Sequence, residues 1–196
     1  MKYEWKTQEK ELYGAKTVPA VVTVPEQNYI MISGEGNPND ADFSNRVSAL
    51  YSVAYAVKKA AQGGIDDFAV YPLEGVWQKI EGDELVKENL QYTLMIRQPG
   101  FIEKDRIDAA LECAKVKKPN PLLEEIRLEI VQGGTCVQIL HIGAYDDELV
   151  SFAMLDKFAR ALSLTRAESC HREIYLNNAN RTENSKLKTI LRYMVK

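Results

Sequence analysis

"FSNRVSALYSVAYAVKKAAQGG", residues 43–64, is the stretch that decides the fold class. Apolar side chains recur in it at spacings of three and four residues, which gathers them on one face of an α-helix. That face consists of Phe43, Val47, Leu50, Ala54, Val57 and Ala61. Gly63 and Gly64 follow, and glycine is a common residue just past a helix end. The stretch therefore predicts an amphipathic helix over residues 43–62.

β-prone segments flank this helix on both sides. "QNYIMISGEGNP" precedes it, and "DFAVYPLEGVW" and "LQYTLMIRQPG" follow it. All three are rich in the β-branched and aromatic residues that favour strands. Pro72 and Gly75 interrupt the middle segment, which indicates an edge strand or a bulge there. Residues 22–99 thus read as strand, helix, strand, strand.

The same order recurs in the second half of the chain. "RLEIVQGGTCVQILHIGAY" precedes a second predicted helix over residues 146–163, and "CHREIYLNN" and "KLKTILRYMV" follow that helix. Its apolar face consists of Leu149, Phe152, Leu155, Ala159 and Leu162. Asp146 and Asp147 suit the positive N-terminal end of this helix. Gly133 and Gly134 lie between two β-prone runs, which predicts a β-hairpin.

These two halves predict an α+β fold made of a tandem repeat. The final strands share letters, "TLMIR" in one half and "TILR" in the other. We expect one domain built from two strand-helix-strand-strand modules, residues 22–99 and 122–196, related by pseudo-two-fold symmetry. A helix over residues 102–117 should connect them. Two such half-sheets would leave a central groove, and concave clefts of this kind are usual ligand sites.

Composition narrows the function further. The chain has 196 residues, 45% of them hydrophobic and 27% charged, with a net charge of −3. Basic residues are not in excess, so the composition does not indicate direct nucleic-acid binding. No apolar run is long enough for a membrane span. Three unpatterned cysteines and two histidines predict a cytoplasmic protein without a metal site. No cofactor motif is present, and a homodimer is one expectation for the oligomeric state.

The strand "HREIYL", residues 171–176, carries the strongest candidate site. Strand side chains alternate between the two faces of a sheet. His171, Glu173 and Tyr175 therefore share one face, while Ile174 and Leu176 share the other. We expect the first face to line the groove, because an acid between a histidine and a tyrosine suits a mixed aromatic and polar pocket.

The chain also resembles a known family, the GyrI-like (gyrase-inhibitor-like) small-molecule-binding proteins. In the first half the resemblance lies in "GEGNP", "ALYSVAYAVK" and "YPLEGVW". In the second half it lies in "VQILHIGAYDDE", "HREIYLNNANRT" and "KLKTILRYMV". Together these motifs run from about Val24 to the C-terminus. Only the set in this order is specific, since no single motif would be.

The resemblance implies both a fold and a choice of functions. The family's fold is a tandem pair of modules around a ligand groove. Its members include drug-sensing domains of transcription activators, proteins that guard gyrase, and stand-alone hydrolases. These hydrolases open the cyclopropane ring of DNA-alkylating natural products of the duocarmycin and yatakemycin type. In the drug sensors a glutamate after the second helix faces the ligand, and Glu173 matches that position.

Several roles stay open for the acid and the aromatic residues. Glu173 could be a solvated strand residue, a general base for hydrolysis, or the counter-ion of a cationic drug. Tyr71 aligns with Tyr175 in the repeat, so we expect Tyr71 to face the same groove from the other half. Trp77 would form a groove wall for a planar ligand, although both aromatics could instead be core residues. A hydroxyl from Tyr71 or Tyr55 would serve as the hydrogen-bond donor.

Three further residues complete the predicted site. His141 lies in an apolar strand and is either a satisfied core histidine or a ligand contact. Tyr145 follows a glycine and could cap the groove mouth. Met95 could be a soft groove wall, with a core position as the alternative.

The sequence therefore predicts a cofactor-independent hydrolase that detoxifies flat, lipophilic, aromatic xenobiotics by opening an electrophilic cyclopropane. Glu173 and Tyr71 would be its catalytic residues. The alternative is a non-catalytic module that binds, sequesters or senses lipophilic cations, or that protects gyrase through a protein contact. A carboxylate among aromatic side chains fits both ligand-binding hypotheses.

Overall fold

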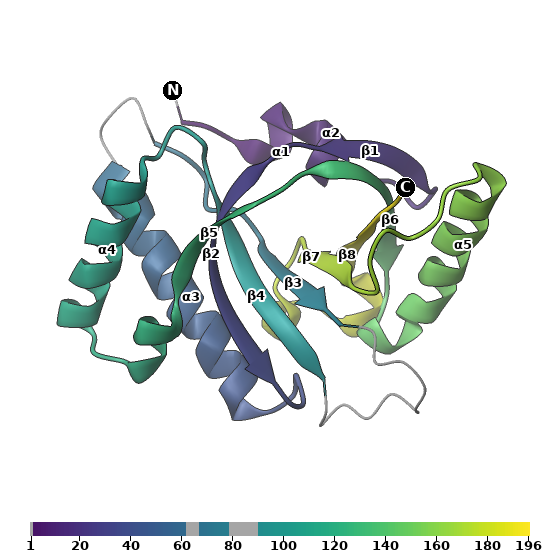
Figure 1. Cartoon of the computed structure of the whole chain (residues 1–196). Helices are drawn as coiled ribbons and strands as arrows, with labels where there is room; N and C mark the ends of the chain where they lie inside the picture. Colours follow the sequence, from purple (N-terminus) through teal and green to yellow (C-terminus); the bar gives the residue numbers. More distant parts are fainter. Residues whose placement is uncertain (1, 62–66, 79–89) are drawn as a thin grey trace.

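An eight-stranded antiparallel sheet forms the centre of the computed structural model, which describes residues 2–61, 67–78 and 90–196 (Figure 1). The strand order is β1-β6-β8-β7-β3-β4-β2-β5. The strands are β1 (Ala20–Val24), β2 (Gln27–Glu35), β3 (Leu73–Trp77), β4 (Gln91–Gln98), β5 (Arg127–Val131), β6 (Gly134–Ile142), β7 (His171–Tyr175) and β8 (Lys188–Met194). With the helices that pack on it, this sheet confirms the predicted α+β class.

The three predicted helices lie close to their expected positions, and two short helices near the N-terminus were not predicted. The helices are α1 (Trp5–Gln8), α2 (Lys10–Tyr13), α3 (Ala41–Ala61), α4 (Lys104–Lys117) and α5 (Glu148–Ala161). Asp146 and Asp147 belong to a short 3₁₀ turn, η3 (Tyr145–Asp147), so α5 begins two residues later than predicted. Gly63 and Gly64 lie outside the described residues. Within the described ranges, none of the helices combines the length and the apolar character of a membrane span.

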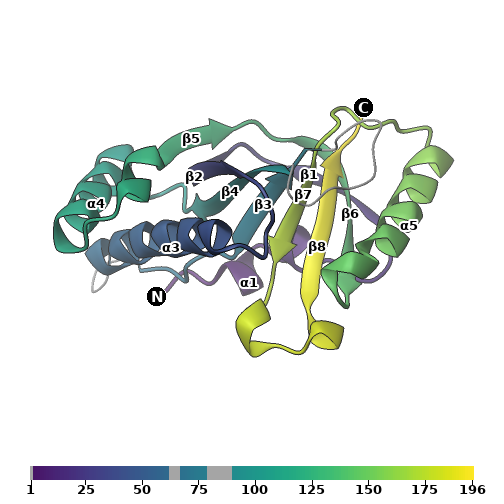
Figure 2. The same ribbon diagram turned by 90° about the horizontal axis from the view of Figure 1, so that it is seen from below.

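Helices α3 and α5 cover the two halves of one sheet face. Leu50 and Val53 of α3 pack in the same core as Ile32 of β2, and Leu155 of α5 packs with Ile139 of β6. Helix α4 packs on α3. Figure 2 shows α3 and α5 on either side of the central strands β3 and β7. Side chains on that face of β3 and β7 therefore lie between the two helices.

The strand register is the same on both sides of the sheet centre. Gly75 of β3 pairs with Glu173 of β7 at the centre. Gly75 pairs outward with Leu94 of β4, and Glu173 pairs outward with Leu191 of β8. The next partners outward are Ile32 of β2 and Ile139 of β6. A duplicated unit would give this register, and superposition of residues 22–99 on 122–196 stays a prediction.

The outermost strands overturn one sequence prediction. β5 and β6 do not form the predicted hairpin, because β5 pairs with β2 and β6 pairs with β1. The β1–β2 and β5–β6 connections instead cross each other (Figure 1). A Cβ atom on Gly133 would lie 2.0 Å from the carbonyl oxygen of Val24 and 2.5 Å from the carbonyl carbon of Pro25. The lack of a side chain at Gly133 therefore lets the two connections cross closely, and Gly133 does not form a tight turn.

The N-terminal segment covers part of the opposite sheet face. Tyr13 of α2 is buried there, and its hydroxyl donates a hydrogen bond to Glu74 of β3 at 3.4 Å. Glu74 is fully buried and also pairs with Arg172 of β7 at 3.4 Å. This ion pair joins the two central strands on the face that α3 and α5 do not cover.

Candidate functional site

The carboxylate of Glu173 is held at the centre of the sheet, on the face that carries α3 and α5. Strand β7 alternates as predicted, so His171, Glu173 and Tyr175 share this face while Ile174 is buried on the other. Nε2 of His171 lies 2.9 Å from Oε1 of Glu173. The hydroxyl of Tyr175 donates to Oε2 at 2.8 Å. Both oxygens are hydrogen-bonded, and the side chain of Glu173 is 12% exposed.

Trp77 extends this arrangement through an aromatic wall. Its indole Nε1–H donates to the hydroxyl of Tyr175 at 3.0 Å. Its ring stacks on Phe43 of α3, with the ring centroids 6.1 Å apart, and lies 5.2 Å from Tyr92 of β4. Trp77 therefore connects the hydrogen bonds around Glu173 to the apolar side chains under α3.

The second aromatic wall comes from η3 and the first turns of α5. Tyr145 contacts Tyr175 edge-on at 5.8 Å, and Phe152 contacts His171 edge-on at 4.7 Å. Burial raises the pKa of Tyr145 to about 12, and the charges of Glu148 and Glu173 act in the same direction. Tyr145 is thus a neutral phenol at neutral pH.

Glu148 is a second acid at this site, which sequence analysis did not identify. It is the first residue of α5 and is only 6% exposed. Burial raises the pKa of Glu148 to about 9, and the charge of Glu173 and a hydrogen bond with it add to this effect. Glu148 therefore carries a proton at neutral pH beside the Glu173 carboxylate. We call Trp77, Tyr145, Glu148, His171, Glu173 and Tyr175 the carboxylate–aromatic cluster.

A weak signal in the sequence could have identified Glu148. Leu149, placed on the predicted apolar stripe of the second helix, is 77% exposed. The residues of α5 that are buried are Glu148, Ser151, Leu155 and Ala159. Their spacings are also three and four, so an acid begins the buried stripe.

His141 lies near the cluster but uses both ring nitrogens within the protein. Nδ1 is 2.9 Å from Oγ of Ser151 in α5, and Nε2 is 3.0 Å from the carbonyl oxygen of Ala144. The residue is 6% exposed and ties β6 to the start of α5. Its predicted role in ligand binding stays a prediction.

Tyr71 and Met95 lie on the opposite face of the sheet, which corrects the predicted groove position of Tyr71 and gives Met95 the core position that was its alternative. Strand β3 begins after Pro72, and its register makes Trp77, not Tyr71, the counterpart of Tyr175. The hydroxyl of Tyr71 donates to Oε1 of Glu9 at 2.5 Å, beneath the N-terminal segment. Met95 is fully buried in a cluster with Tyr29 and Met31. Neither residue can line a site with Glu173.

Tyr55 is also displaced from its expected position. It is 57% exposed on α3, so its hydroxyl does not reach the central strands. Tyr51, one turn earlier, is more buried and hydrogen-bonds to the backbone of Leu73 in β3. The buried stripe of α3 runs through Leu50, Val53 and Val57, which turns Tyr51 towards the sheet centre.

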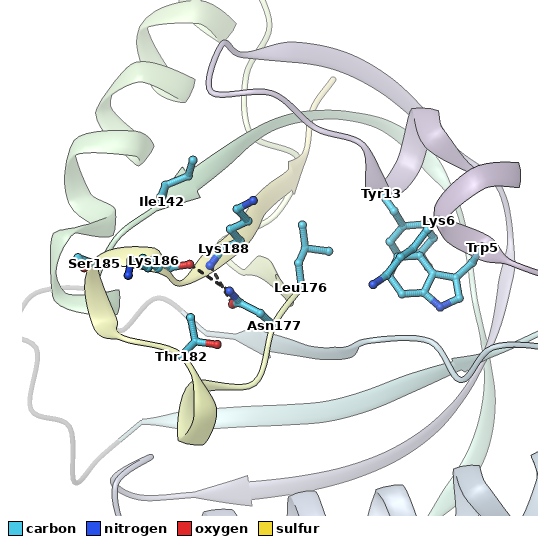
Figure 3. Close-up of a pocket in the computed structure, with 10 residues that line it drawn as sticks. All are labelled: Trp5, Lys6, Tyr13, Ile142, Leu176, Asn177, Thr182, Ser185, Lys186 and Lys188. Carbon is cyan, nitrogen blue, oxygen red and sulfur yellow. Dashed lines mark hydrogen bonds between the residues drawn. The ribbon is translucent and has the colours of Figure 1, made fainter.

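A large cavity lies away from the carboxylate–aromatic cluster, on the face beside the N-terminal segment (Figure 3). Its volume is about 710 Å³. It is lined by Trp5, Lys6, Tyr13, Ile142, Leu176, Asn177, Thr182, Ser185, Lys186 and Lys188. None of these ten side chains is a carboxylate. We therefore assign the candidate catalytic site to the cluster, where the two acids meet.

Replacing Gly75 with alanine is expected to disturb the cluster directly. The new Cβ atom would lie 2.8 Å from Nε1 of Trp77 and 3.0 Å from the hydroxyl of Tyr175. The hydrogen bond between these groups should break, with a loss of about 1–3 kcal/mol in the free energy of unfolding. Chemical denaturation and near-ultraviolet circular dichroism would measure both effects. Gly100→Ala is the matched control, since nothing lies within 4 Å of its added Cβ. Equal stability and equal spectra in both variants would contradict this packing.

Comparisons with known proteins gave one matching family model and several similar structures. The chain matches the GyrI-like small molecule binding domain over residues 17–194. A structure described as a hydrolase from Listeria innocua has 32% identity and a TM-score of 0.91, with all of both chains covered. An uncharacterized conserved protein from Listeria innocua gives the same values. No curated protein matches the chain.

A more distant likeness concerns the fold alone. The C-terminal domain of EcmrR has 14% identity and a TM-score of 0.55, covering 91% of this chain and 96% of that one. The match over residues 17–194 takes in every strand of the sheet and the whole carboxylate–aromatic cluster. The chain therefore belongs to the GyrI-like family of small-molecule binding domains.

Proposed function

We propose that this protein hydrolyses flat, lipophilic, aromatic electrophiles, and that its substrates are activated cyclopropanes of the duocarmycin and yatakemycin type. The observation that carries the proposal is the Glu173 carboxylate, fixed by two hydrogen bonds among aromatic side chains. Membership of a small-molecule-binding family and the hydrolase described from Listeria innocua support it.

Five members of the cluster have a role in the proposed reaction. Trp77 and Tyr145 would hold a planar ligand by burial and ring contact. Glu173 would take a proton from the attacking water, and such a positioned base is worth about 100-fold or more in rate. Tyr175 and His171 would keep the carboxylate oriented. The reaction needs only water as its second reactant.

A binding function is the second candidate, and one observation favours it. Within the described ranges, the side chains that hydrogen-bond to Glu173 are His171, Tyr175 and Glu148, and none of them is a lysine or an arginine. A carboxylate held in this way beside aromatic rings could also pair with a lipophilic cation. The protein would then sequester or sense such ligands without converting them.

Compartment and assembly belong to the same proposal. Cys113, Cys136 and Cys170 are free thiols, which suits a reducing cytoplasm. Direct binding of nucleic acid is not part of the proposed function. Homodimerisation stays a prediction that size-exclusion chromatography with light scattering would measure.

Product analysis tests the proposal most directly. Purified protein incubated with a neutral cyclopropane drug should yield a product heavier by one molecule of water, detected by liquid chromatography and mass spectrometry. The drug in buffer alone gives the spontaneous rate. Drug that binds tightly but is recovered chemically unchanged after long incubation would overturn the enzyme hypothesis in favour of the binding function.

A further inference from the structure

Glu148 and Glu173 come from distant parts of the chain and meet over the central strands. Glu148 begins α5, whereas Glu173 lies in the middle of β7. Thr189 of β8 lies near both acids. Its backbone pairs with Tyr175 of β7 on one side and with His141 of β6 on the other. The Thr189 hydroxyl and the Glu148 carboxyl lie close enough to interact.

Two buried polar atoms at this place have no hydrogen-bond partner in the described part of the chain. They are Oε1 of Glu148 and Oγ1 of Thr189. Buried polar atoms are almost always hydrogen-bonded, and exceptions occur at functional sites. Both atoms are buried and lie close to each other, so a polar group of a substrate would reach them only by replacing this contact beside the Glu173 carboxylate.

The surroundings of Glu148 favour its protonated form. Burial is the largest cause, because it disfavours the charged form of Glu148. The second cause is the adjacent Glu173, since two neighbouring carboxyl groups do not both ionise easily. Asp146 adds further negative charge from η3, while the Thr189 hydroxyl opposes part of the effect. The phenols of Tyr145 and Tyr175 also interact with Glu148. His141 of β6 hydrogen-bonds to Ser151, one turn further along α5, and to the carbonyl oxygen of Ala144.

We propose that Glu148 and Glu173, which are in contact, act as an acid and base pair in which Glu148 donates its proton to the substrate oxygen that gains charge during hydrolysis. The inference rests on the proposed function and adds a second catalytic residue to it. A pair of carboxyl groups held in different protonation states is the usual arrangement of an acid and a base in one site.

The proposed step balances without any further reactant. The water oxygen bonds to a ring carbon while a ring carbon–carbon bond breaks, and that electron pair moves through the conjugated system to the carbonyl oxygen. Glu173 takes a proton from the water, and Glu148 gives its proton to that oxygen, which becomes a phenol. Glu173 then passes its new proton to Glu148 across their contact, which restores the starting state.

Glu148→Gln tests this role because glutamine mimics the neutral carboxylic acid but cannot donate its proton. We expect kcat to fall about 100-fold with little change in KM. The rate of the wild type should decline on the alkaline side as Glu148 ionises near pH 9, and this limb should vanish in the variant. Asp147→Asn, at the exposed neighbouring position, is the control and should behave as wild type. A Glu148→Gln enzyme with full kcat and an unchanged alkaline limb would overturn the proposal.

A second measurement needs no substrate. Infrared titration should show a protonated carboxyl group well above the normal range of glutamic acid, and this signal should be absent from Glu148→Gln. Absence of the signal from the wild type would overturn the acid and base pair. Signal without any turnover by the wild type would instead overturn the proposed hydrolysis, and the donor role with it.

The stability of the wild type should change with pH through Glu148, and the sign of this change follows from linkage. Folding raises the pKa of Glu148 from 4.5 to about 9, so the folded state binds this proton more tightly than the unfolded state. The contribution of Glu148 to stability is therefore present below the unfolded value and is lost as pH rises through the folded value. Denaturation curves of Glu148→Gln should lack this loss, and a loss equal to that of wild type would contradict the pairing.

Discussion

Glu173→Gln is expected to reduce turnover of a neutral cyclopropane drug by about 100-fold or more. Glutamine keeps the size of the side chain but removes both its charge and its basicity. Affinity should change little, since the stacked pair of Trp77 and Phe43 and the edge contact of Tyr145 are untouched. Single-turnover kinetics would measure the rate, and calorimetry would measure the affinity.

The same variant separates the two candidate functions. If Glu173 is a counter-ion, Glu173→Gln should weaken the binding of lipophilic cations by about 1.5–3 kcal/mol, and the wild type should convert no drug. Glu129→Gln is the matched control, because Glu129 lies on the edge strand β5 and is about half exposed. Wild-type turnover that survives unchanged in Glu173→Gln would remove the general base from the mechanism.

The second large effect is expected at the crossing of the two connections. Gly133→Ala would place a Cβ atom 2.0 Å from a backbone oxygen, that of Val24, and neither backbone can move away without breaking strand pairing. We expect the free energy of unfolding to fall by about 3 kcal/mol or more, at the upper end for overpacking. Urea denaturation would measure the loss.

The adjacent glycine supplies the control for this substitution. A Cβ atom on Gly134 would meet only the side chain of Met194, at 3.4 Å or more, and that flexible side chain can adjust. Gly134→Ala should therefore cost much less than Gly133→Ala. Similar losses in both variants would indicate a general intolerance of alanine here and would contradict the crossing as the cause.

The order of elements could be predicted because each signal for it is local. The apolar stripe of α3 lies within one helix, and its observed bounds, Ala41–Ala61, differ from the predicted 43–62 by two residues or fewer. Strand partners are not local. Gly133 and Gly134 resemble a hairpin turn in sequence, but the partner of β5 is β2, about a hundred residues away in the chain.

The sequence predicted the candidate site only where the alternation of side chains along a strand determines which face they occupy. The shared face of His171, Glu173 and Tyr175 follows from strand geometry alone. The face of Tyr71 depends on where β3 begins, and its start after Pro72 cannot be read from letter similarity to β7. Glu148 was missed because acids at a helix start already have an explanation in the helix dipole. The spacing of Glu148 with Ser151 and Leu155 is the local signal for its burial, and it is weak because the exposed Asp147 lies one turn before the same Ser151.

The pairing of the outermost strands has a consequence for how the two halves depend on each other. β1 belongs to the first half but completes the sheet of the second, and β5 belongs to the second half but completes the sheet of the first. Each half isolated from the other would therefore expose an unpaired strand edge, a site prone to aggregation. The peptide linkage through α4 is then not what holds the halves together. Two fragments cut between them would each contain the strand that the other lacks, so reassembly without a covalent link is built into the topology.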